Sequence, residues 1–362
     1  MDEQIINIDW EFLFESISEE KTVLFIGNSI DINPDGKNAQ SNFFENFFLE
    51  NSKDIISYHK HDGFLLFKDE GTKMRLTTRI KKFYQQNFAN EILDKISKIP
   101  FHLIVLVSPE LTIKNIFNTS NYQFDYNYFD KRVLRDIDAY PTKEKPLIYN
   151  LFGTIEDTET LIVSHQDLFE YLRALYGSNS LPIKLRTLLS KEKASNFIFI
   201  GLDFDKWYFQ LLLNLLELNN DRFIRYASIN ELDFDNKTLC ENHFKINFIS
   251  KNSTSFINTI YDYFDKKNEL RKPVLAEEKP KKYIVSNIQR FISEGFDDDT
   301  LNVLCLGSFY EVYNQFAANM SKTMKVGLLI NFVIKQNLVA DLLKYSQELN
   351  PRGYENFKPY WE

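Results

Sequence analysis

Short apolar runs that end in a small or polar residue recur along the first two thirds of the chain. The clearest run lies within Pro146–Ile155 and turns at Gly153. The same pattern occurs at Lys21–Asn28, Phe101–Ser108 and Phe197–Asp203. Each run is too short for a helix, and apolar residues at helical spacing follow it. This alternation predicts an α/β fold with parallel strands that are joined by helices and buried on both faces.

We expect any chemistry at the residues that directly follow these strands. They are Gly27, Ser108, Gly153 and Gly201. Because ligands in an open parallel sheet bind at the carboxyl ends of the strands, these positions should share one edge. The loop Gly27-Asn28-Ser29 stands where a dinucleotide-binding fold places its phosphates. It lacks the full Gly-x-Gly-x-x-Gly pattern, so a plain tight turn is the alternative.

A β-hairpin is predicted from Ile55–Tyr58 and Phe64–Phe67, with His59 and His61 in its loop. On a strand, two histidines at this spacing would share a face and could bind a metal. No third ligand is evident, so we expect an exposed turn and no metal site. The remaining predicted strands are Tyr122–Phe129 (an edge strand or a loop), Thr160–Ser164, Phe223–Ala227 and Phe244–Ile249.

The chain can form a large core, since 44% of the residues are hydrophobic and 33 are Phe. The features that follow lead us to expect a soluble, cytoplasmic protein. The net charge of −8 argues against nucleic-acid binding, which normally requires a basic face. Cys240 and Cys305 suit a reducing compartment and form no metal cluster. No apolar run approaches the roughly 18 residues of a membrane span. The acidic start Met1-Asp2-Glu3-Gln4 is unlike a signal peptide.

The composition changes after Phe264. Residues 265–282 are rich in Lys, Glu and Pro, which predicts a linker between residues 1–264 and residues 283–362. Beyond it, apolar residues at a spacing of three to four predict a small helical bundle.

The charges of this bundle are segregated along the sequence. Asp297, Asp298 and Asp299 are adjacent, whereas Lys322, Lys325 and Lys335 come later. Opposed acidic and basic patches would favour homotypic docking. Capping carboxylates with a solvated lysine face are the alternative.

Four segments of the first region carry a family resemblance. They are Val23–Gly27, Pro146–Ile155, Leu161–Ser164 and Gly201–Trp207. In this order they resemble the SIR2-like proteins of bacterial defence systems. The resemblance implies a Rossmann-like sheet that binds NAD and, in active members, cleaves the nicotinamide–ribose bond. The turn Gly295–Asp299 and the helices beyond it resemble an effector-associated, death-like domain, which implies docking on a protein partner.

The sequence departs from the family pattern at each implied active-site motif. The first loop keeps only Gly27 of Gly-Ala-Gly-x-Ser. Ser108, Pro109 and Glu110 stand where the family has an Asn and an Asp. Phe152 stands in place of the catalytic His of Leu-His-Gly. Phe cannot transfer a proton, and loss of an acid/base group costs about 100- to 10,000-fold in rate.

These departures favour a pseudoenzyme of antiviral defence, which binds an NAD-type nucleotide or assembles with partners through its C-terminal domain. The implied nucleotide contacts are Gly27, Asn28, Ser29, Ser108, Gly153, Gly201 and Asp203. Two alternatives stay open. One is an active NAD⁺ glycohydrolase, with candidate groups at His102, Glu110, His165, Asp203 and Asp205. The other is a structural adaptor that only oligomerises. For His165, a helix cap or an exposed position is the alternative to proton transfer.

Overall fold

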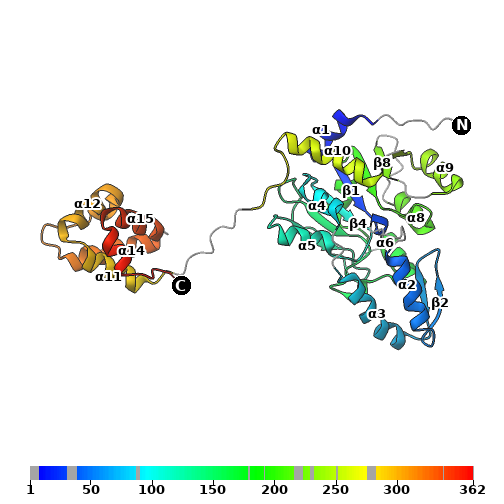
Figure 1. The fold of residues 1–362 in the computed structure, drawn as a ribbon, viewed down its shortest axis with the longest axis horizontal. Coiled ribbons are helices and arrows are strands. Elements are labelled where there is room, and N and C mark those ends of the chain that lie inside the picture. Colours follow the sequence, from blue (N-terminus) through cyan, green and yellow to red (C-terminus); the bar gives the residue numbers. More distant parts are fainter. Residues whose placement is uncertain are drawn as a thin grey trace. The chain divides into compact units, whose positions relative to one another are not determined.

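The chain divides into two units, Met1–Leu275 and Ala276–Glu362 (Figure 1). A computed structural model describes residues 8–30, 39–86, 90–177, 180–190, 192–215, 223–228, 232–249, 252–274, 283–336 and 338–361. Each unit buries its own set of apolar side chains.

Within the described residues, seven parallel strands form the sheet of the first unit, in the order β5-β6-β4-β1-β7-β8-β9. Their bounds are β1 Thr22–Ile26, β4 Leu103–Leu106, β5 Asp125–Tyr128, β6 Leu147–Asn150, β7 Asn196–Ile200, β8 Ile224–Ser228 and β9 Ile246–Ile249. The central strand β1 pairs with β4 on one side and β7 on the other. The strand order therefore reverses at β1, which is where open α/β sheets bind ligands. The predicted parallel sheet is confirmed.

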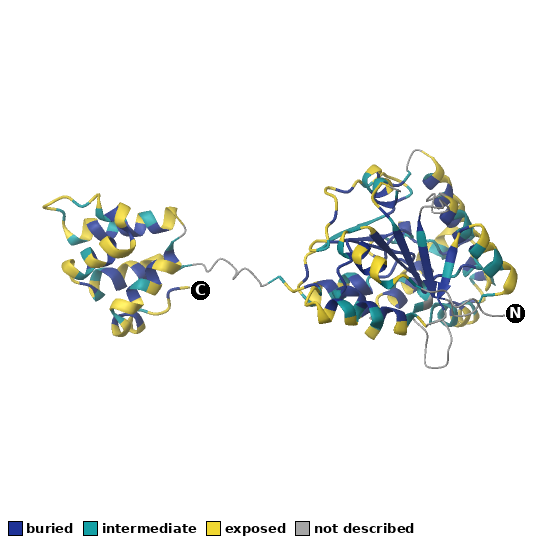
Figure 2. Cartoon of the chain, turned by 90° about the horizontal axis from the view of Figure 1, so that it is seen from above, coloured by how far each residue is buried: buried dark blue, intermediate teal, exposed yellow. Residues whose placement is uncertain are grey.

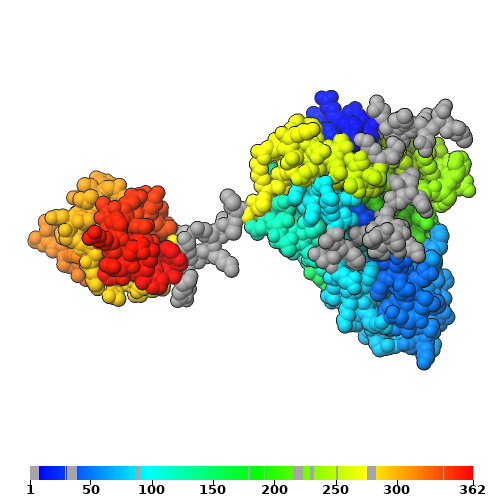
Figure 3. Space-filling model, viewed as in Figure 1, coloured from blue at the N-terminus to red at the C-terminus, as the bar shows by residue number. Residues whose placement is uncertain are grey.

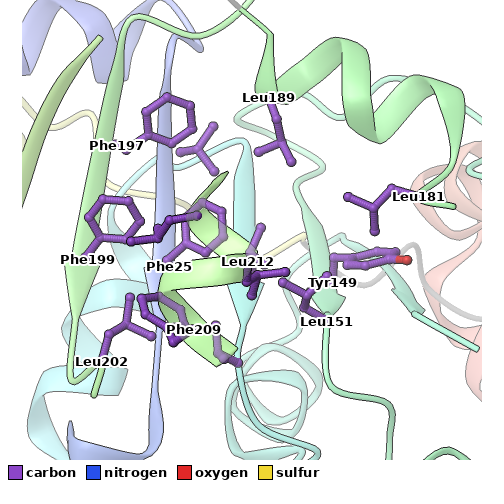
Figure 4. Close-up of a cluster of buried hydrophobic side chains, with 14 of the residues drawn as sticks. Phe25, Tyr149, Leu151, Leu181, Leu189, Phe197, Phe199, Leu202, Phe209 and Leu212 are labelled. Atoms are coloured by element: carbon purple, nitrogen blue, oxygen red, sulfur yellow. The ribbon is translucent and has the colours of Figure 1, made fainter. Parts of the chain in front are cut away.

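Helices cover both faces of this sheet. Along β1, Val23 and Phe25 point into one layer, and Leu24 and Ile26 point into the other. The first layer contains α6 (His165–Tyr176), α7 (Ile183–Leu189), α8 (Trp207–Leu215) and α9 (Phe234–Asn242). The second contains α1 (Trp10–Ser18), α4 (Glu91–Lys98), α5 (Thr112–Thr119) and α10 (Ser253–Lys266). Figure 2 shows the buried strands between helices with exposed outer faces, and Figure 4 shows side chains packed around Phe25.

A small cap, residues 39–84, is inserted between β1 and β4. It consists of α2 (Ala39–Glu50), the antiparallel hairpin β2 (Ile55–His59) and β3 (Phe64–Phe67), and α3 (Glu70–Tyr84). Its own core includes Phe44, Leu65 and Leu76, which lie in one apolar cluster with Leu161 and Val163 from the chain beyond β6. Figures 1 and 3 show α2, β2 and α3 side by side as one block. The predicted hairpin is confirmed.

The predicted strand Thr160–Ser164 is wrong. Residues Thr158–Thr160 form a short 3-10 helix instead, and the chain after it is extended without joining the sheet. The Thr160 hydroxyl donates to the backbone oxygen of Asp157 (2.7 Å) and holds this turn. Val163 accepts a hydrogen bond from Leu65 N of the cap (2.9 Å). The apolar run is therefore explained by packing against the cap rather than by strand pairing.

The predicted linker 265–282 differs from the structure in its first part. Residues 265 and 266 end α10, and Arg271 is buried in the first unit. The Arg271 guanidinium donates to the backbone oxygens of Ser97 (3.0 Å), Ile99 (3.2 Å) and Phe101 (2.9 Å), and to that of Lys143. These hydrogen bonds therefore hold the polar segment around Arg271 against the rest of the first unit. Residues 275–282 lie outside the described part of the chain.

The second unit is a helical bundle. Its helices are α11 (Val285–Gly295), α12 (Asp298–Ser308), α13 (Tyr310–Tyr313), α14 (Lys322–Lys335), α15 (Val339–Leu349) and α16 (Pro351–Asn356). Phe291, Leu301, Leu329 and Leu342 lie at the centre of its core and are fully buried. No described helix of either unit is both long and apolar enough to cross a bilayer.

Several charges of the second unit are paired within it. Lys325 is buried, and its Nζ lies 2.8 Å from Asp298 Oδ2. Lys322 Nζ donates to a backbone oxygen of α11 (2.6 Å), and Asp297 caps α12 by accepting from Thr300 N (2.7 Å). The predicted separation of an acidic patch from a basic patch is therefore wrong at these positions. Asp297 caps its own helix α12, and Asp298 of α12 pairs with Lys325 of α14 because these two helices meet in the bundle.

We predict that Arg271→Met lowers the free energy of unfolding of the first unit by about 2–4 kcal/mol, because buried carbonyl oxygens lose their donors. The matched control is Lys272→Met at the exposed neighbouring position, which should change it by less than about 0.5 kcal/mol. Urea unfolding, followed by hydrogen exchange of peptides from each unit, measures the difference. Equal stability of the two variants would contradict the anchoring role.

Candidate functional site

A cavity lies between the carboxyl edge of the sheet and the cap. The sheet edge contributes Gly27, Asn28, Val107, Pro109, Phe152 and Gly201. The cap contributes Gln40, Asp62, Gly63, Phe64 and Tyr84. The start of α8 and the loop before it contribute Leu202, Asp203, Lys206, Tyr208 and Phe209. The cavity thus occupies the switch point at β1, where the strand order reverses.

The cavity is small in this structure, with a volume of about 70 Å³. That is room for a few water molecules. Pockets that bind drug-sized ligands measure roughly 300–1,000 Å³. The space between the described walls is therefore smaller than a dinucleotide.

The glycines at the sheet edge are required by the packing of the backbone itself. A Cβ on Gly27 would lie 2.3 Å from the Gly201 backbone oxygen. Gly201 has φ +65°, and a Cβ there would lie 2.4 Å from Ile30 N. Gly153 has φ +78°, and its Cβ would lie 2.3 Å from the Thr160 oxygen. These residues are fixed by sterics whether or not a ligand binds, because only Gly tolerates such contacts and positive φ values.

Phe152 forms part of the cavity wall. Its ring centroid lies 5.3 Å from that of Tyr171 and 6.2 Å from that of Tyr208. The side chain is half-buried and packs against the apolar layer that contains α6 and α8. An aromatic hydrocarbon therefore takes the position where the family resemblance implies a histidine, and it extends the core into the cavity.

The residues on either side of Pro109 serve the loop after β4. Asn150 Nδ2 donates to the backbone oxygens of Ser108 (3.2 Å) and Glu110 (2.9 Å). Glu110 Oε2 accepts from Thr112 N at the start of α5 (2.5 Å). Burial raises the pKa of Glu110, and its hydrogen bonds to Thr112 offset this only in part. Ser108 and Glu110 therefore hold the backbone, and only Pro109 of these three lines the cavity.

The hairpin tip, residues 59–63, reaches across to α6 and to the loop before α8. His165 Nε2 lies 3.0 Å from Asp62 Oδ2, and His61 Nδ1 lies 3.2 Å from Asp62 Oδ1. Lys206 Nζ donates to the His61 backbone oxygen, and Tyr208 OH donates to that of Asp62 (3.3 Å). Burial raises the pKa of Asp62, but the hydrogen bonds from His165 and His61 outweigh it, so this pKa is lowered. Asp62 is therefore held ionised between two histidines.

The structure brings together some of the predicted site residues and separates others. Gly27, Asn28, Pro109, Phe152, Gly201 and Asp203 line the cavity. Glu110, Ser108 and Gly153 support loops beside it, and the side chain of Ser29 lies outside the described part. His165 does not line the cavity but contacts two residues that do, Asp62 by a hydrogen bond and Phe64 by ring packing (5.1 Å between centroids). His102 precedes β4 and therefore lies at the amino edge of the sheet, where burial lowers its pKa to about 4.

Sequence reasoning missed the contributions of the cap and of α8. The residues between the two hairpin strands, which include Asp62, were expected to form an exposed turn, and Lys206 had no predicted role. The His-Lys-His-Asp-Gly stretch was the one available signal, because charged groups gather there at a turn. Within the described residues, no group of three or more His, Cys, Asp or Glu side chains is arranged to hold a metal ion.

Two family models match the chain. Residues 110–243 match the SIR2-like domain, and residues 288–351 match effector-associated domain 7. The chain contains both domains. This confirms the resemblance of each region, although the first match begins at Glu110 and leaves Gly27, Ser108 and Pro109 outside it. No curated protein matches the chain.

We predict that Gly201→Ala lowers the free energy of unfolding of the SIR2-like unit by about 2–4 kcal/mol, because the methyl group would meet Ile30 N and force a strained φ. Gly307→Ala is the matched control. Its Cβ meets no atom within 4 Å, and it lies in helix α12, so this change should stabilise the second unit by up to about 1 kcal/mol. Urea titration of each variant, resolved by unit through hydrogen exchange, tests the contrast.

Proposed function

We propose that the chain is a bacterial antiviral-defence protein whose SIR2-like unit binds an NAD-type nucleotide without cleaving it. The effector-associated unit then joins it to a protein partner in the cytoplasm. The pairing of the two matched domains supports a defence-type SIR2 module.

One observation carries the proposal that the site is degenerate, namely the ring of Phe152 in the cavity wall. Cleavage of the nicotinamide–ribose bond requires a group that orients the ribose hydroxyl or accepts its proton. Phe152 can do neither, and its ring packs against Tyr171 and Tyr208 in the cavity wall. General acid/base groups contribute about 100- to 10,000-fold in rate.

The polar groups of the cavity support a ligand with hydroxyl groups. Asp62 and Asp203 place carboxylates in the wall, and Lys206 adds an ammonium group. Carboxylates accept hydrogen bonds from ribose hydroxyls in other nucleotide-binding sheets. The hydrogen bonds from His165 and His61 lower the pKa of Asp62, which favours the charged form of this acceptor.

The glycohydrolase alternative draws its main support from the Asp62–His165 pair, since a carboxylate that orients a histidine is a common catalytic arrangement. His165 does not line the cavity, however, and its Nε2 is already paired with Asp62 Oδ2 (3.0 Å). The adaptor alternative predicts no nucleotide binding at all. Nucleotide binding without turnover therefore distinguishes our proposal from both alternatives.

We predict that the full chain releases nicotinamide from NAD at a rate indistinguishable from buffer. Phe152→His should gain at most weak turnover, because Pro109 and the first loop also depart from the family pattern. Phe152→Ala is the matched control, since it opens the same space without adding a proton acceptor. Chromatographic detection of nicotinamide measures all three. Rapid release by the unmodified chain would contradict the proposal.

We further propose that residues 283–362 fold independently and dock the partner. The fully buried core around Phe291, Leu301 and Leu329 supports this, although domains of this size are marginally stable. We predict that the fragment 283–362 is helical by circular dichroism and captures the partner that the full chain captures. A fragment ending at Val274 keeps Arg271 and serves as the control. Capture by that fragment alone would place docking in the SIR2-like unit.

A further inference from the structure

The hairpin tip, residues 59–63, closes one side of the cavity. Asp62 and Gly63 line the cavity, as does Phe64, where β3 begins. The opposite walls belong to the sheet edge and to the start of α8, which are fixed by the packing of the main core. The tip is therefore the wall that can move with the least disruption of buried structure.

The tip is closed by the pairing of His59 with Phe64 and by a hydrogen bond from Gly63 N to the His59 oxygen (2.8 Å), and side-chain contacts hold it against the rest of the unit. It touches α6 through the Asp62–His165 hydrogen bond (3.0 Å). It touches the region before α8 through Lys206 and Tyr208, both of which donate to backbone oxygens of the tip. His61 adds a contact to Asp205 at 3.7 Å. Most of these contacts are partly exposed, so each can break without leaving a buried group unpaired.

The first residues of β3, directly after the tip, are anchored much more firmly. Phe64 and Leu65 are buried, at 5% and 1% exposure, and Leu65 N donates to the Val163 oxygen (2.9 Å). At the tip itself, Gly63 adopts φ +82° and no atom lies within 4 Å of a Cβ built there. Buried side chains therefore fix the chain from Phe64 onward, whereas open space surrounds Gly63 and His59 ends β2 on the other side of the tip.

We propose that the hairpin tip is a lid that the Asp62–His165 contact latches shut, and that a ligand reaches the cavity only when this contact breaks. The lid explains how a cavity of about 70 Å³ can belong to a binding site for a much larger molecule. Only the identity of that molecule rests on the proposed function. Asp62 is then both the latch and one of the two carboxylate residues that line the cavity.

The test places a thiol under the lid and measures how often the lid opens. Val107 lines the cavity and is 6% exposed, and the native Cys240 and Cys305 are buried. In full-length Val107→Cys protein, the new thiol should react slowly with Ellman's reagent. The further change His165→Phe keeps a ring but removes the N–H that donates to Asp62. Because this hydrogen bond to a charged group is lost, the thiol should react roughly tenfold faster.

Matched variants distinguish loss of the Asp62–His165 contact from a general loosening of the folded unit. His165→Gln retains an N–H that can donate to Asp62, so its rate should stay close to that of Val107→Cys alone. Lys206→Met removes a different contact to the tip and should also raise the rate, which provides a second route if His165→Phe folds poorly. The lid proposal would be contradicted if neither His165→Phe nor Lys206→Met changed the rate of thiol modification. A fast-reacting thiol in the Val107→Cys protein without either change would also contradict it.

NAD binding then distinguishes this inference from the proposed function. If the lid must open first, NAD should associate faster with His165→Phe than with the unmodified chain. If no variant binds NAD while the thiol rates change as expected, the lid stands and the nucleotide proposal fails. If NAD binds but the thiol rates do not change, the lid fails and the nucleotide proposal stands.

Discussion

The close approach of the backbone after β1 to the backbone after β7 determines the shape of this site. Gly27 and Gly201 allow these two backbone segments to approach more closely than a Cβ at either position would permit. Gly27 N donates to the Ile200 oxygen (2.9 Å), so the contact continues the pairing of the two central strands. The floor of the cavity, the turn through Ile30 and the position of Asp203 all depend on this contact.

The cavity built on this floor differs from a ready-made catalytic pocket. Its wall at Phe152 is aromatic, the loop at Pro109 lacks a backbone donor, and the buried Glu110 is used to hold Thr112. Its polar groups instead come from the cap and from the start of α8. A site with acceptors for hydroxyl groups, but with no proton-transfer group at the expected position, suits recognition better than turnover.

The sequence predicted the sheet well because buried parallel strands read as unbroken apolar runs. It failed at Thr160–Ser164, where a similar run packs against the cap, since an apolar run records burial and not hydrogen-bond partners. The cavity walls were only half predictable. Phe152 and Gly201 follow strands and could be placed, whereas the contact between His61 and Lys206 joins residues that are 145 positions apart. The charges of the second unit were misjudged for the same reason, because Lys325 meets Asp298 only in the folded bundle.

Binding of intact NAD by the SIR2-like unit is the central property to test. The most direct measurement incubates the full chain with NAD for a day, separates bound from free nucleotide, and identifies both by mass spectrometry. We predict bound NAD with its nicotinamide–ribose bond intact and no excess of ADP-ribose over a protein-free sample. Accumulation of ADP-ribose, or a complete lack of bound nucleotide at saturating NAD, would contradict it.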